Sequence, residues 1–492
     1  MSPPLAARLS GFAGQHVVVV GEAMLDAYLH GRVDRLSREA PVPVVAVGQV
    51  VDAPGGAANA AANVTALGGR ATLVSVRGDD AEGVRLDQAM SAESVDRGGV
   101  VVDPGRTTLA KQRVVAMDQM LLRFDTGTTE RLPEAIDREL VARIEANVPS
   151  ADAIVISDYD YGVVSEAVRD AIARCRRPGQ PLIVDARDLR RYRTLRPTAV
   201  KPNYAEATRL LAQPEERNPA RRREQMLAHG PRLLDETGAE VVALTVDRDG
   251  AMLFERDQTP YRTYARPRPH ARAAGAGDTF VAALALGFAA GASAPIATEL
   301  ASAAAAVVVG KDGTSTCTAD ELRALLTLGG KRLEGADRIR QIVDFQRRQG
   351  HRIVFTNGCF DILHRGHITY LNRAKALGDL LIVAVNDDAG VARLKGPSRP
   401  INSLDDRLGV LEALSCVDHV VAFEEEIPAR LIEAIRPDVY VKGGDYDVAN
   451  LPEAPLVESL GGVVQILPYV EDRSTSGVIE RVRASLAEAA RS

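Results

Sequence analysis

The sequence lacks the features that mark membrane, secreted or nucleic-acid-binding proteins. It has no run of about 18 apolar residues and therefore predicts no membrane-spanning helix. Its first residues show no basic region followed by an apolar core and a cleavage site, which argues against a secretory signal. The four cysteines form no CxxC pair, so no disulfide framework is predicted and a reducing compartment is favoured. A net charge of -6 predicts no general nucleic-acid binding. We expect a cytoplasmic protein without a membrane or nucleic-acid partner.

Lysine is also scarce. Of the 60 basic residues only seven are lysines, at positions 111, 201, 311, 331, 375, 395 and 442. Lysine carries a compact, mobile charge suited to a phosphate oxygen. At least four of the seven fall within the motifs described below. Phosphate binding and an ordinary surface position are the two interpretations of each.

Length and periodicity predict two α/β domains. The chain has 492 residues, 46% hydrophobic and 26% charged, as in soluble globular proteins. Apolar runs alternate with helical patterns, which indicates largely parallel sheets. Strands are expected at 16–21, 71–76, 153–157, 181–186 and 241–246, and then at 352–357, 380–386, 419–423, 439–442 and 463–467. We expect a first domain over 1–319, a helical connector over 320–350, and a doubly wound, Rossmann-like domain over 351–492.

Two segments of the first domain depart from this alternation. Residues 42–51 and 107–125 are rich in β-formers, and the second segment predicts a hairpin turned at 117–119. A small β-sheet over an α/β core is expected to serve as a lid. Its exposed edges would be protected by pairing with a second copy, so we expect a homodimer through the lid.

A glycine-rich turn, Gly275-Ala276-Gly277-Asp278, precedes an apolar helical stretch. Glycines at a helix start let backbone N–H groups approach an oxyanion, and the helix dipole adds attraction. An aspartate beside this anion hole can accept the proton of a hydroxyl that attacks a phosphoryl group. Such a turn with an aspartate near the N-cap is also a common structural device, so the motif alone leaves both interpretations open.

Other polar motifs of this domain lie at strand ends and helix starts. They are Asp26 after the first strand, Gly55-Gly56 with Asn59 at a helix start, Asp158 at a strand end, and Asn203 with Glu206 after another strand. Ligands of α/β folds bind at the carboxyl ends of strands. A carboxylate there suits sugar hydroxyls, and an amide with a carboxylate suits a magnesium–phosphate assembly.

In this order and spacing, the motifs resemble the ribokinase-like sugar kinases over essentially the first 319 residues. The resemblance implies that Asp278 is the catalytic base and that Gly275, Ala276 and Gly277 form the anion hole. It implies that Asn203 and Glu206 place Mg–ATP, with Glu206 reaching Mg²⁺ indirectly. The implied substrate-binding residues are Asp26, Gly55, Gly56, Asn59 and Asp158, with Lys111 and Arg113 reaching from the lid to the phosphate of the substrate.

The tract at 36–45 is similar to the heptose-phosphate branch of that family, but two positions depart from the family pattern. Arg272 stands where an aspartate is common, which puts dependence on a monovalent cation in doubt. Tyr161 stands where the heptose branch tends to have lysine, which makes the identity of the sugar less secure than the reaction type.

The second domain opens with TNGCFDILHRGH at 356–367. His364 and His367 are three residues apart, so at a helix start both imidazoles face one side and can donate to phosphate oxygens. This suits attack on the α-phosphate of a nucleotide with loss of pyrophosphate. Two other interpretations are ordinary capping histidines and a zinc site with Cys359, which lacks an obvious fourth ligand.

With the motifs downstream, this segment resembles the cytidylyltransferase-like family over 351–492. The resemblance implies a catalytic role for His364 and His367. The implied nucleotide- and phosphate-binding residues are Thr356, Asn357, Gly358, Phe360, Lys375, Asp387, Lys395, Arg407, Lys442, Gly443, Asp445, Ser474, Thr475 and Ser476. Of these, Arg407 is expected to begin a helix and 474–476 to cap the last one.

The fusion of the two domains resembles the bifunctional D-glycero-β-D-manno-heptose 7-phosphate kinase/heptose 1-phosphate adenylyltransferases. This implies ATP-dependent phosphorylation of heptose 7-phosphate at C1. It also implies adenylyl transfer from ATP to heptose 1-phosphate, with pyrophosphate released. The implied cofactor is Mg²⁺, with ATP as a substrate. The alternatives are another sugar, CTP in place of ATP, or one domain that binds without catalysis.

Overall fold

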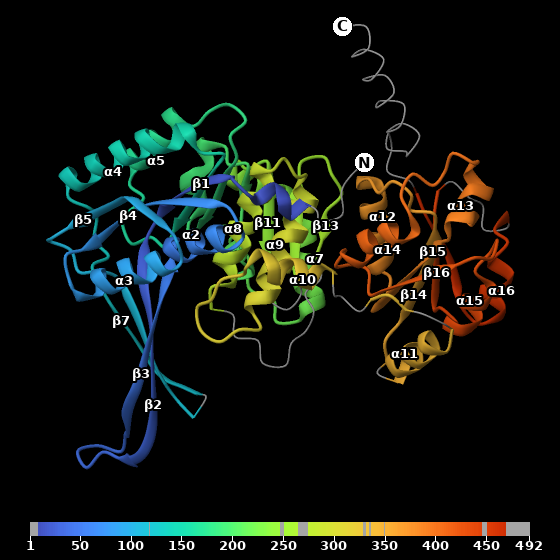
Figure 1. Ribbon diagram of the computed structural model, residues 1–492, viewed down its shortest axis with the longest axis horizontal. Coiled ribbons are helices and arrows are strands. Elements are labelled where there is room, and N and C mark those ends of the chain that lie inside the picture. Colours follow the sequence, from blue (N-terminus) through green and yellow to red (C-terminus); the bar gives the residue numbers. More distant parts are fainter. Residues whose placement is uncertain are drawn as a thin grey trace, which may run out of the picture. The chain divides into compact units, whose positions relative to one another are not determined.

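The structure is a computed structural model that describes residues 8–117, 119–246, 250–263, 274–327, 331–333, 336–348, 350–444 and 450–468. Contacts divide the chain after Leu322 into two units, which are described separately. Figure 1 colours the first unit from blue to yellow and the second from orange to red. Both units are α/β, so the predicted fold class is confirmed.

The first unit is built on a nine-stranded sheet with the order β13-β12-β11-β10-β9-β8-β1-β4-β5. Its strands are β1 (His16–Gly21), β4 (Arg70–Gly78), β5 (Asp96–Asp103), β8 (Ala153–Asp158), β9 (Leu182–Ala186), β10 (Ala199–Val200), β11 (Val241–Thr245), β12 (Ala251–Glu255) and β13 (Tyr261–Arg262). From β5 to β11 all neighbours are parallel. The five strands expected here are confirmed. The other four were not expected: β10 and β13 span only two residues, β5 contains Gly98-Gly99, and β12 was missed although its five residues match the length of expected strands.

Helices cover both faces of this sheet. They are α2 (Ala57–Ala66), α3 (Ala81–Ala92), α4 (Glu134–Asn147), α5 (Glu166–Cys175), α6 (Tyr204–Leu210), α7 (Pro219–Thr237), α8 (Ala276–Ala289) and α9 (Ala294–Val308). The boundary between the two units falls within a further helix, α10 (Ala319–Thr327). Alternate residues of β1 point to opposite faces, and Val18 and Val20 join the core beneath α4, α5 and α7. On the other face the alanine-rich helix α2 packs closely against α8. This packing brings Asn59 to Asp278.

A separate four-stranded sheet forms the expected lid, with the order β3-β2-β6-β7. Its strands are β2 (Ala23–Leu36), β3 (Pro43–Gly56), β6 (Ala110–Ala116) and β7 (Gln119–Thr126). The β6–β7 hairpin turns where it was predicted, and Figure 1 shows β2 and β3 as a long ribbon extending from the α/β body. Asp26 lies within β2, so it belongs to the lid sheet.

The second unit has a parallel sheet of five strands in the order β16-β15-β14-β17-β18. The strands, all confirmed, are β14 (Ile353–Gly358), β15 (Leu380–Asn386), β16 (His419–Phe423), β17 (Val439–Gly443) and β18 (Val463–Leu467). The helices are α11 (Ala336–Arg348), α12 (Arg365–Lys375), α13 (Asp388–Lys395), α14 (Leu404–Glu412), α15 (Ala429–Ile435) and α16 (Ala454–Ser459). Ile339 and Val343 of α11 are fully buried in this core. The segment expected as a connector therefore supplies part of the core of this unit.

Candidate active sites

Asp278 lies in the first turn of α8, where both of its carboxylate oxygens receive hydrogen bonds. Asn59 Nδ2 donates to Oδ2 at 2.8 Å, and the hydroxyl of Tyr159 donates to Oδ1 at 3.0 Å. The side chain is only 7% exposed. Burial raises the pKa of Asp278 to about 6, and the bonds from Asn59 and Tyr159 act in the opposite direction. A carboxylate with this pKa is ionised at neutral pH and can still accept a proton.

The backbone before Asp278 requires glycine. Gly275 is the N-cap of α8 with a φ of 82°, and a Cβ there would lie 2.8 Å from Asn59 Nδ2. The free N–H groups of this first turn and the positive end of the helix dipole form an anion site beside the carboxylate. Gly275, Ala276 and Gly277 therefore lie where the anion hole was expected.

Lys201 adds a buried positive charge that was not predicted as a site residue. It is 5% exposed, and its Nζ lies 3.2 Å from Asp185 Oδ2. A Cβ at Gly277 would be 3.5 Å from the same Nζ, so the ammonium lies beside the glycine turn. Burial lowers the pKa of Lys201, but Asp185 and other carboxylates raise it above its usual value on balance. The signal for it was present, because Lys201 is one of only seven lysines.

Asp26 faces the lid and the loop after α9. Arg113 Nη1 donates to its Oδ1 at 2.8 Å, and Thr314 Oγ1 donates to its Oδ2 at 2.7 Å. A Cβ at Gly55 would lie 2.8 Å from Oδ2, so the first glycine of the Gly55-Gly56 pair makes room for this carboxylate. The structure thus brings together three of the residues predicted to bind the substrate, Asp26, Gly55 and Arg113. Thr314 was not predicted, because the sequence gives no signal that its loop returns to β2.

Lys111 joins the two parts of this site. Its Nζ lies 4.9 Å from the centre of the Tyr159 ring. Burial lowers its pKa, while Asp26 and Asp278 act to raise it. The lid therefore brings a half-buried cation toward the Asp278 carboxylate of the α/β body.

Three predicted residues are engaged in local structure. Asp158 is 4% exposed and accepts bonds from Asp160 N and the Tyr192 hydroxyl, so it shapes its own loop. Asn203 and Glu206 form a capping box at the start of α6, with both bonds at 2.8 Å. Arg272 lies outside the described residues.

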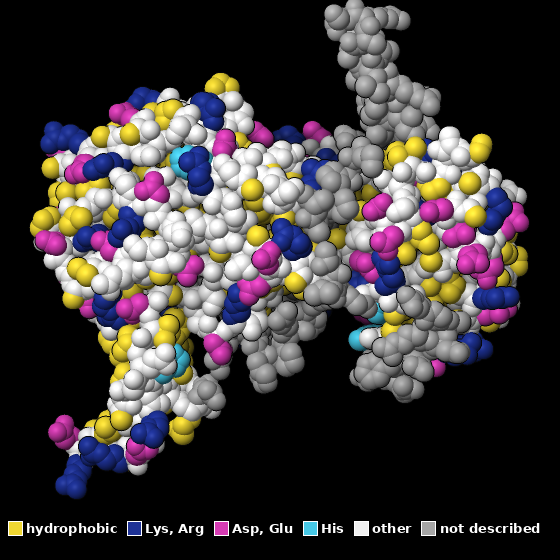
Figure 2. Space-filling model, viewed as in Figure 1, with side chains coloured by type: hydrophobic (Ala, Val, Ile, Leu, Met, Phe, Trp, Pro, Cys, Tyr) yellow, Lys and Arg dark blue, Asp and Glu magenta, His cyan; other side chains and the backbone are white. Residues whose placement is uncertain are grey.

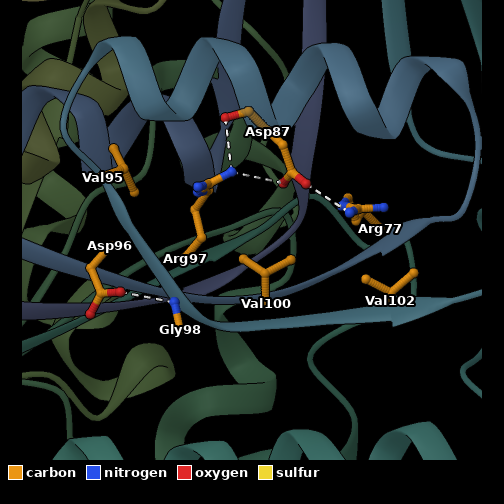
Figure 3. A pocket seen from close by; sticks show the side chains of 8 residues that line it. All are labelled: Arg77, Asp87, Val95, Asp96, Arg97, Gly98, Val100 and Val102. Carbon is orange, nitrogen blue, oxygen red and sulfur yellow. Dashed lines mark hydrogen bonds and ion pairs between the residues drawn. The ribbon is translucent and has the colours of Figure 1, made fainter.

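One hollow of about 440 Å³ lies elsewhere on the first unit, between α3 and the strands β4 and β5. Figure 3 shows Asp87 between Arg77 and Arg97, with the Arg77 contact at 2.7 Å. The carboxylate offsets much of the positive charge of the two guanidinium groups. None of the predicted site residues lines this hollow.

In the second unit, His364 is the N-cap of α12, and its ring lies against that of His367. The two ring centres are 4.1 Å apart, and His364 Nδ1 accepts a hydrogen bond from Gly366 N at 3.1 Å. Phe360, whose φ is 47°, packs at 5.7 Å from the His367 ring. Burial lowers the pKa of His367 to about 3, with His364 and Lys395 adding to the effect. His367 is therefore neutral at physiological pH.

A polar cluster lies at the ends of β14 and β17. Asn357 Oδ1 accepts bonds from Lys442 Nζ at 3.0 Å and from the Tyr440 hydroxyl at 2.6 Å. Lys442 Nζ also donates to Glu453 Oε1 at 2.8 Å, and Thr356 Oγ1 bonds Tyr370 at 2.6 Å. These strand ends lie at the carboxyl edge of a parallel sheet, where ligands bind.

Two predicted phosphate-binding residues do not belong to this group. Lys375 is at the last turn of α12, about 16 Å along the helix from His364. Its Nζ bonds Asp379 O and, at 2.6 Å, Asp418 Oδ2 at the amino ends of the strands. Arg407 is 1% exposed and lies inside α14, not at its beginning. Its Nη1 donates to Cys359 O and its Nη2 to Asp388 Oδ1, while its buried Nε has no hydrogen-bond partner among the described residues.

The remaining predicted residues of this domain fall into two sets. Asp387 caps α13 through Gly390 N at 2.7 Å, and exposed Lys395 ends that helix near Cys359 and His367. The positions outside the described residues are Asp445, Ser474, Thr475 and Ser476. Asp361 was not predicted, yet its carboxylate accepts bonds from the backbone of Ile401 and Asn402 and thereby holds the loop before α14.

Within the described ranges, no group of three or more His, Cys, Asp or Glu side chains is arranged to hold a metal ion. The thiol of Cys359, considered for a zinc site, instead lies 3.8 Å from Asn386 Oδ1. No described helix combines the length and apolar character needed to cross a bilayer.

Comparisons with known proteins agree with the division of the chain into two α/β units. The model of the pfkB family carbohydrate kinases matches residues 15–321, and that of the cytidylyltransferase-like family matches 355–481. The bifunctional protein HldE of Azotobacter vinelandii is 41% identical over 473 residues, covering 95% of this chain and 97% of that protein. HldE of Paramagnetospirillum magneticum is 38% identical, covering 98% and 99%. Phosphofructokinase-2 of Escherichia coli shares the fold of the first unit, with 22% identity, a TM-score of 0.53, and coverage of 63% of this chain and 97% of that one.

Proposed function

We propose that two separate sites carry out two reactions in this chain, which belongs to the family of bifunctional HldE proteins. It consists of a pfkB family carbohydrate kinase fused to a cytidylyltransferase-like transferase. It is a sugar-phosphate kinase and a nucleotidyltransferase. The first site transfers a phosphoryl group from ATP to C1 of heptose 7-phosphate. The second site transfers AMP from ATP to heptose 1-phosphate and releases pyrophosphate.

The observation that carries the kinase assignment is the position of Asp278 at the amino end of α8. The C1 hydroxyl oxygen attacks the γ-phosphorus while its proton passes to the Asp278 carboxylate. The bond from the γ-phosphorus to the bridging oxygen of ADP breaks. The N–H groups at Gly275–Gly277 and the ammonium of Lys201 stabilise the charge that spreads over the transferring group.

Mg²⁺ is proposed as the cofactor of this site, where it would neutralise phosphate charge. Magnesium prefers carboxylate oxygens and retains several waters. Glu206 keeps one oxygen beyond its capping bond, and Asp185 lies close enough to interact with it electrostatically. Burial raises the pKa of Asp185 to about 7, a cost that a nearby cation would offset. These residues fit an ion that is held partly through water.

The sugar is proposed to bind against Asp26, Gly55, Gly56 and Asn59. Arg113 is already paired with Asp26 and stacks on Tyr28 at 4.9 Å, so it serves to orient that carboxylate. Lys111 has no carboxylate within salt-bridge distance in the described chain and is the better candidate for the phosphate of the substrate.

In the transferase, the phosphate oxygen of the sugar attacks the α-phosphorus of ATP and the bond to pyrophosphate breaks. His364 and His367 lie at the amino end of α12, where imidazole and helix N–H groups can donate to the charged oxygens. Lys442 and Lys395 provide the positive charges at this edge of the sheet. Asn357, beside Lys442, holds that ammonium in place.

Two assays decide the nucleotide base and the sugar separately. The full-length enzyme is supplied with heptose 1-phosphate and either ATP or CTP, and pyrophosphate release is measured. Release with ATP alone is expected, whereas release with CTP alone would overturn the adenylyl assignment. In parallel, heptose 7-phosphate and an unrelated phosphosugar are compared as kinase substrates through ADP production, with the heptose expected to be preferred.

A homodimer through the lid is proposed from the apolar side chains of that sheet. Figure 2 shows apolar side chains along the lid. The exposed ones are Leu36, Val42, Val47, Val50, Val51, Met117, Met120, Leu121, Leu122 and Phe124. Exposed apolar patches mark association sites. Light scattering at micromolar concentration is expected to give a dimer for the native chain and a monomer for Leu122→Glu.

The four free cysteines favour a reducing compartment such as the cytoplasm.

A further inference from the structure

Tyr159 is the residue that connects the loop after β8 to the catalytic carboxylate. Its hydroxyl donates to Asp278 Oδ1 at 3.0 Å, and Lys111 lies over its ring. Burial and the neighbouring carboxylates raise the pKa of Tyr159 well above its usual value, so the phenol stays protonated. The hydroxyl therefore remains a hydrogen-bond donor to Asp278 at any pH at which the enzyme works.

The backbone of this loop is held by a buried carboxylate, Glu22, which follows β1 directly. Glu22 is 0% exposed and accepts three backbone N–H bonds, from Tyr159 at 2.7 Å, Tyr161 at 3.3 Å and Val163 at 3.2 Å. A buried carboxylate is costly unless donors surround it. Because all three donors come from one short loop, the position of the Glu22 carboxylate and the conformation of that loop depend on each other.

The charged groups that face Glu22 are Asp158 and Arg106. Burial raises the pKa of Glu22 to about 7 and Asp158 adds to this effect, whereas Arg106, itself 5% exposed, interacts with Glu22 electrostatically. Arg106 also holds the loop, because its Nη2 donates a hydrogen bond to Tyr161 O at 2.8 Å. The phenol of Tyr159 is thus presented to the site by a loop that is fixed at both faces.

We propose that Glu22 and Tyr159 form a positioning pair for Asp278, in which Glu22 fixes the loop and the Tyr159 hydroxyl fixes one oxygen of the catalytic carboxylate. This rests on the proposed kinase function, since it takes Asp278 as the base. The bond selects the rotamer of Asp278 and favours its ionised form, because a donor to a carboxylate disfavours protonation. Asn59 fills the same role at Oδ2, and together they leave the remaining lone pairs for the sugar hydroxyl.

Four charged groups also face Asp278 and are retained in every variant below. Lys201 and Asp26 act on Asp278 directly, Asp185 approaches from β9, and Lys111 from the lid. Because these two cations and two carboxylates are the same in every variant, a difference in the pH dependence of the kinase rate between Tyr159→Phe and the native chain is due to the lost hydroxyl.

The first test compares Tyr159→Phe with a matched control, Tyr161→Phe. Tyr161 lies two residues away, and its hydroxyl bonds Arg187 at 3.3 Å, not Asp278. Kinase kcat and KM are measured from pH 5 to pH 9 on the full chain. Tyr159→Phe is expected to lower kcat about tenfold at pH 7, since a hydrogen bond to a charged group is worth about that factor. The acid limb of its kcat profile should move to higher pH, and that of Tyr161→Phe should not move.

The second test asks whether Glu22 acts through Tyr159. Glu22→Gln is expected to shift the acid limb in the native background and to add little in Tyr159→Phe. An equal shift in both backgrounds would overturn the role of Glu22, and an unmoved limb in Tyr159→Phe would overturn the pair altogether. If Glu22→Gln does not fold, Glu22→Asp replaces it, because it keeps the charge and retracts it by one methylene.

Two further measurements separate this inference from the function beneath it. The transferase rate of every variant reports that the preparation is active. Asp278→Asn tests the base itself: if it retains kinase turnover, the proposed function fails. If Asp278→Asn is inactive while Tyr159→Phe behaves as native, only the positioning pair fails.

Discussion

Asn59 donates a 2.8 Å hydrogen bond to Asp278 from a position 219 residues earlier in the chain. One residue lies on α2 and the other on α8, and the alanine-rich surfaces of these helices allow their close packing. Both residues were predicted for the site, Asn59 for the sugar and Asp278 as the base. In the structure Asn59 is also bonded to the base, so its first effect is on the orientation of that carboxylate.

Replacing Asp278 with alanine should abolish kinase turnover and leave the transferase unaffected. The carboxylate is proposed to accept the proton of the attacking hydroxyl, whereas the transferase has its own polar cluster at β14 and β17. ADP formation from heptose 7-phosphate and pyrophosphate formation from heptose 1-phosphate are measured on the same preparation. An unchanged kinase rate would show that another residue is the base.

Asp278 should also reduce the stability of the fold at alkaline pH. Its pKa is about 6 in the folded chain against 3.8 for an unperturbed carboxyl, because it is buried. A raised pKa stabilises the fold fully below the unfolded value, and this contribution is lost as the pH rises through about 6. At pH 8, Asp278→Asn should therefore have an unfolding free energy higher than that of the native chain by up to about 3 kcal/mol, and should unfold at a higher temperature. The gain should shrink at pH 5, as followed by thermal denaturation.

Glycine at 275 should matter for both stability and activity. Alanine would place a Cβ 2.8 Å from Asn59 Nδ2 in a residue whose φ is 82°. We expect Gly275→Ala to cost about 1–2 kcal/mol of unfolding free energy and to lower the kinase rate by displacing Asn59.

Gly291→Ala is the matched control for this change. Gly291 has a φ of 73°, but a Cβ there meets nothing within 4 Å. It should lose about 1 kcal/mol of stability from the backbone alone and keep the kinase rate. Equal kinase rates in the two variants would contradict the steric argument.

Periodicity was sufficient to predict the fold, because the buried parallel strands are continuous apolar runs. Every expected strand is present, from HVVVVG at β1 to VVQIL at β18. Short elements escaped prediction. The two-residue strand β10 has too few residues to show a pattern, although it leads directly to Lys201.

Site residues were predictable where a local motif carries them and not where the fold alone unites them. Asp278 and His364 mark their own helix starts, so the sequence pattern is enough. Thr314 and Glu22 reach the kinase site through contacts over long stretches of chain, and neither lies in a motif. Lys375 shows the opposite case. It lies within the motif region, but helix geometry carries it to the far edge of the sheet.

The corrected position of Lys375 leads to a paired prediction with Lys442. Lys375→Met should lower the unfolding temperature, because Asp418 loses its ammonium partner and keeps only the bond from Leu381 N, and should leave the KM for ATP in the transferase unchanged. Lys442→Met should reduce nucleotidyl transfer, since it removes a cation at the ligand edge. Steady-state kinetics and thermal denaturation of both variants check this. A raised KM in Lys375→Met without loss of stability would restore the phosphate-binding interpretation.

His367 should act as a neutral donor throughout the physiological range. Burial lowers its pKa to about 3, so the ring carries no charge between pH 5 and pH 8. His367→Ala is expected to lower nucleotidyl transfer by about 100-fold or more, as for the loss of one preorganised donor at developing charge. His367→Asn should retain more activity than alanine, because its amide is also an uncharged donor. Exposed His351, before β14, provides the control, and His351→Ala should leave the rate unchanged.

The pH dependence of the same residue gives a second, independent measurement. The folded chain binds a proton at His367 less readily than the unfolded chain, whose imidazole has a pKa of 6.5. Stability should therefore decrease as the pH falls below about 6.5, and more shallowly in His367→Asn than in the native chain. Denaturant titrations at pH 7 and pH 5 measure this difference. A transferase rate that follows an ionisation near pH 6.5 in the native enzyme and loses it in His367→Asn would show instead that the imidazole is charged during the reaction.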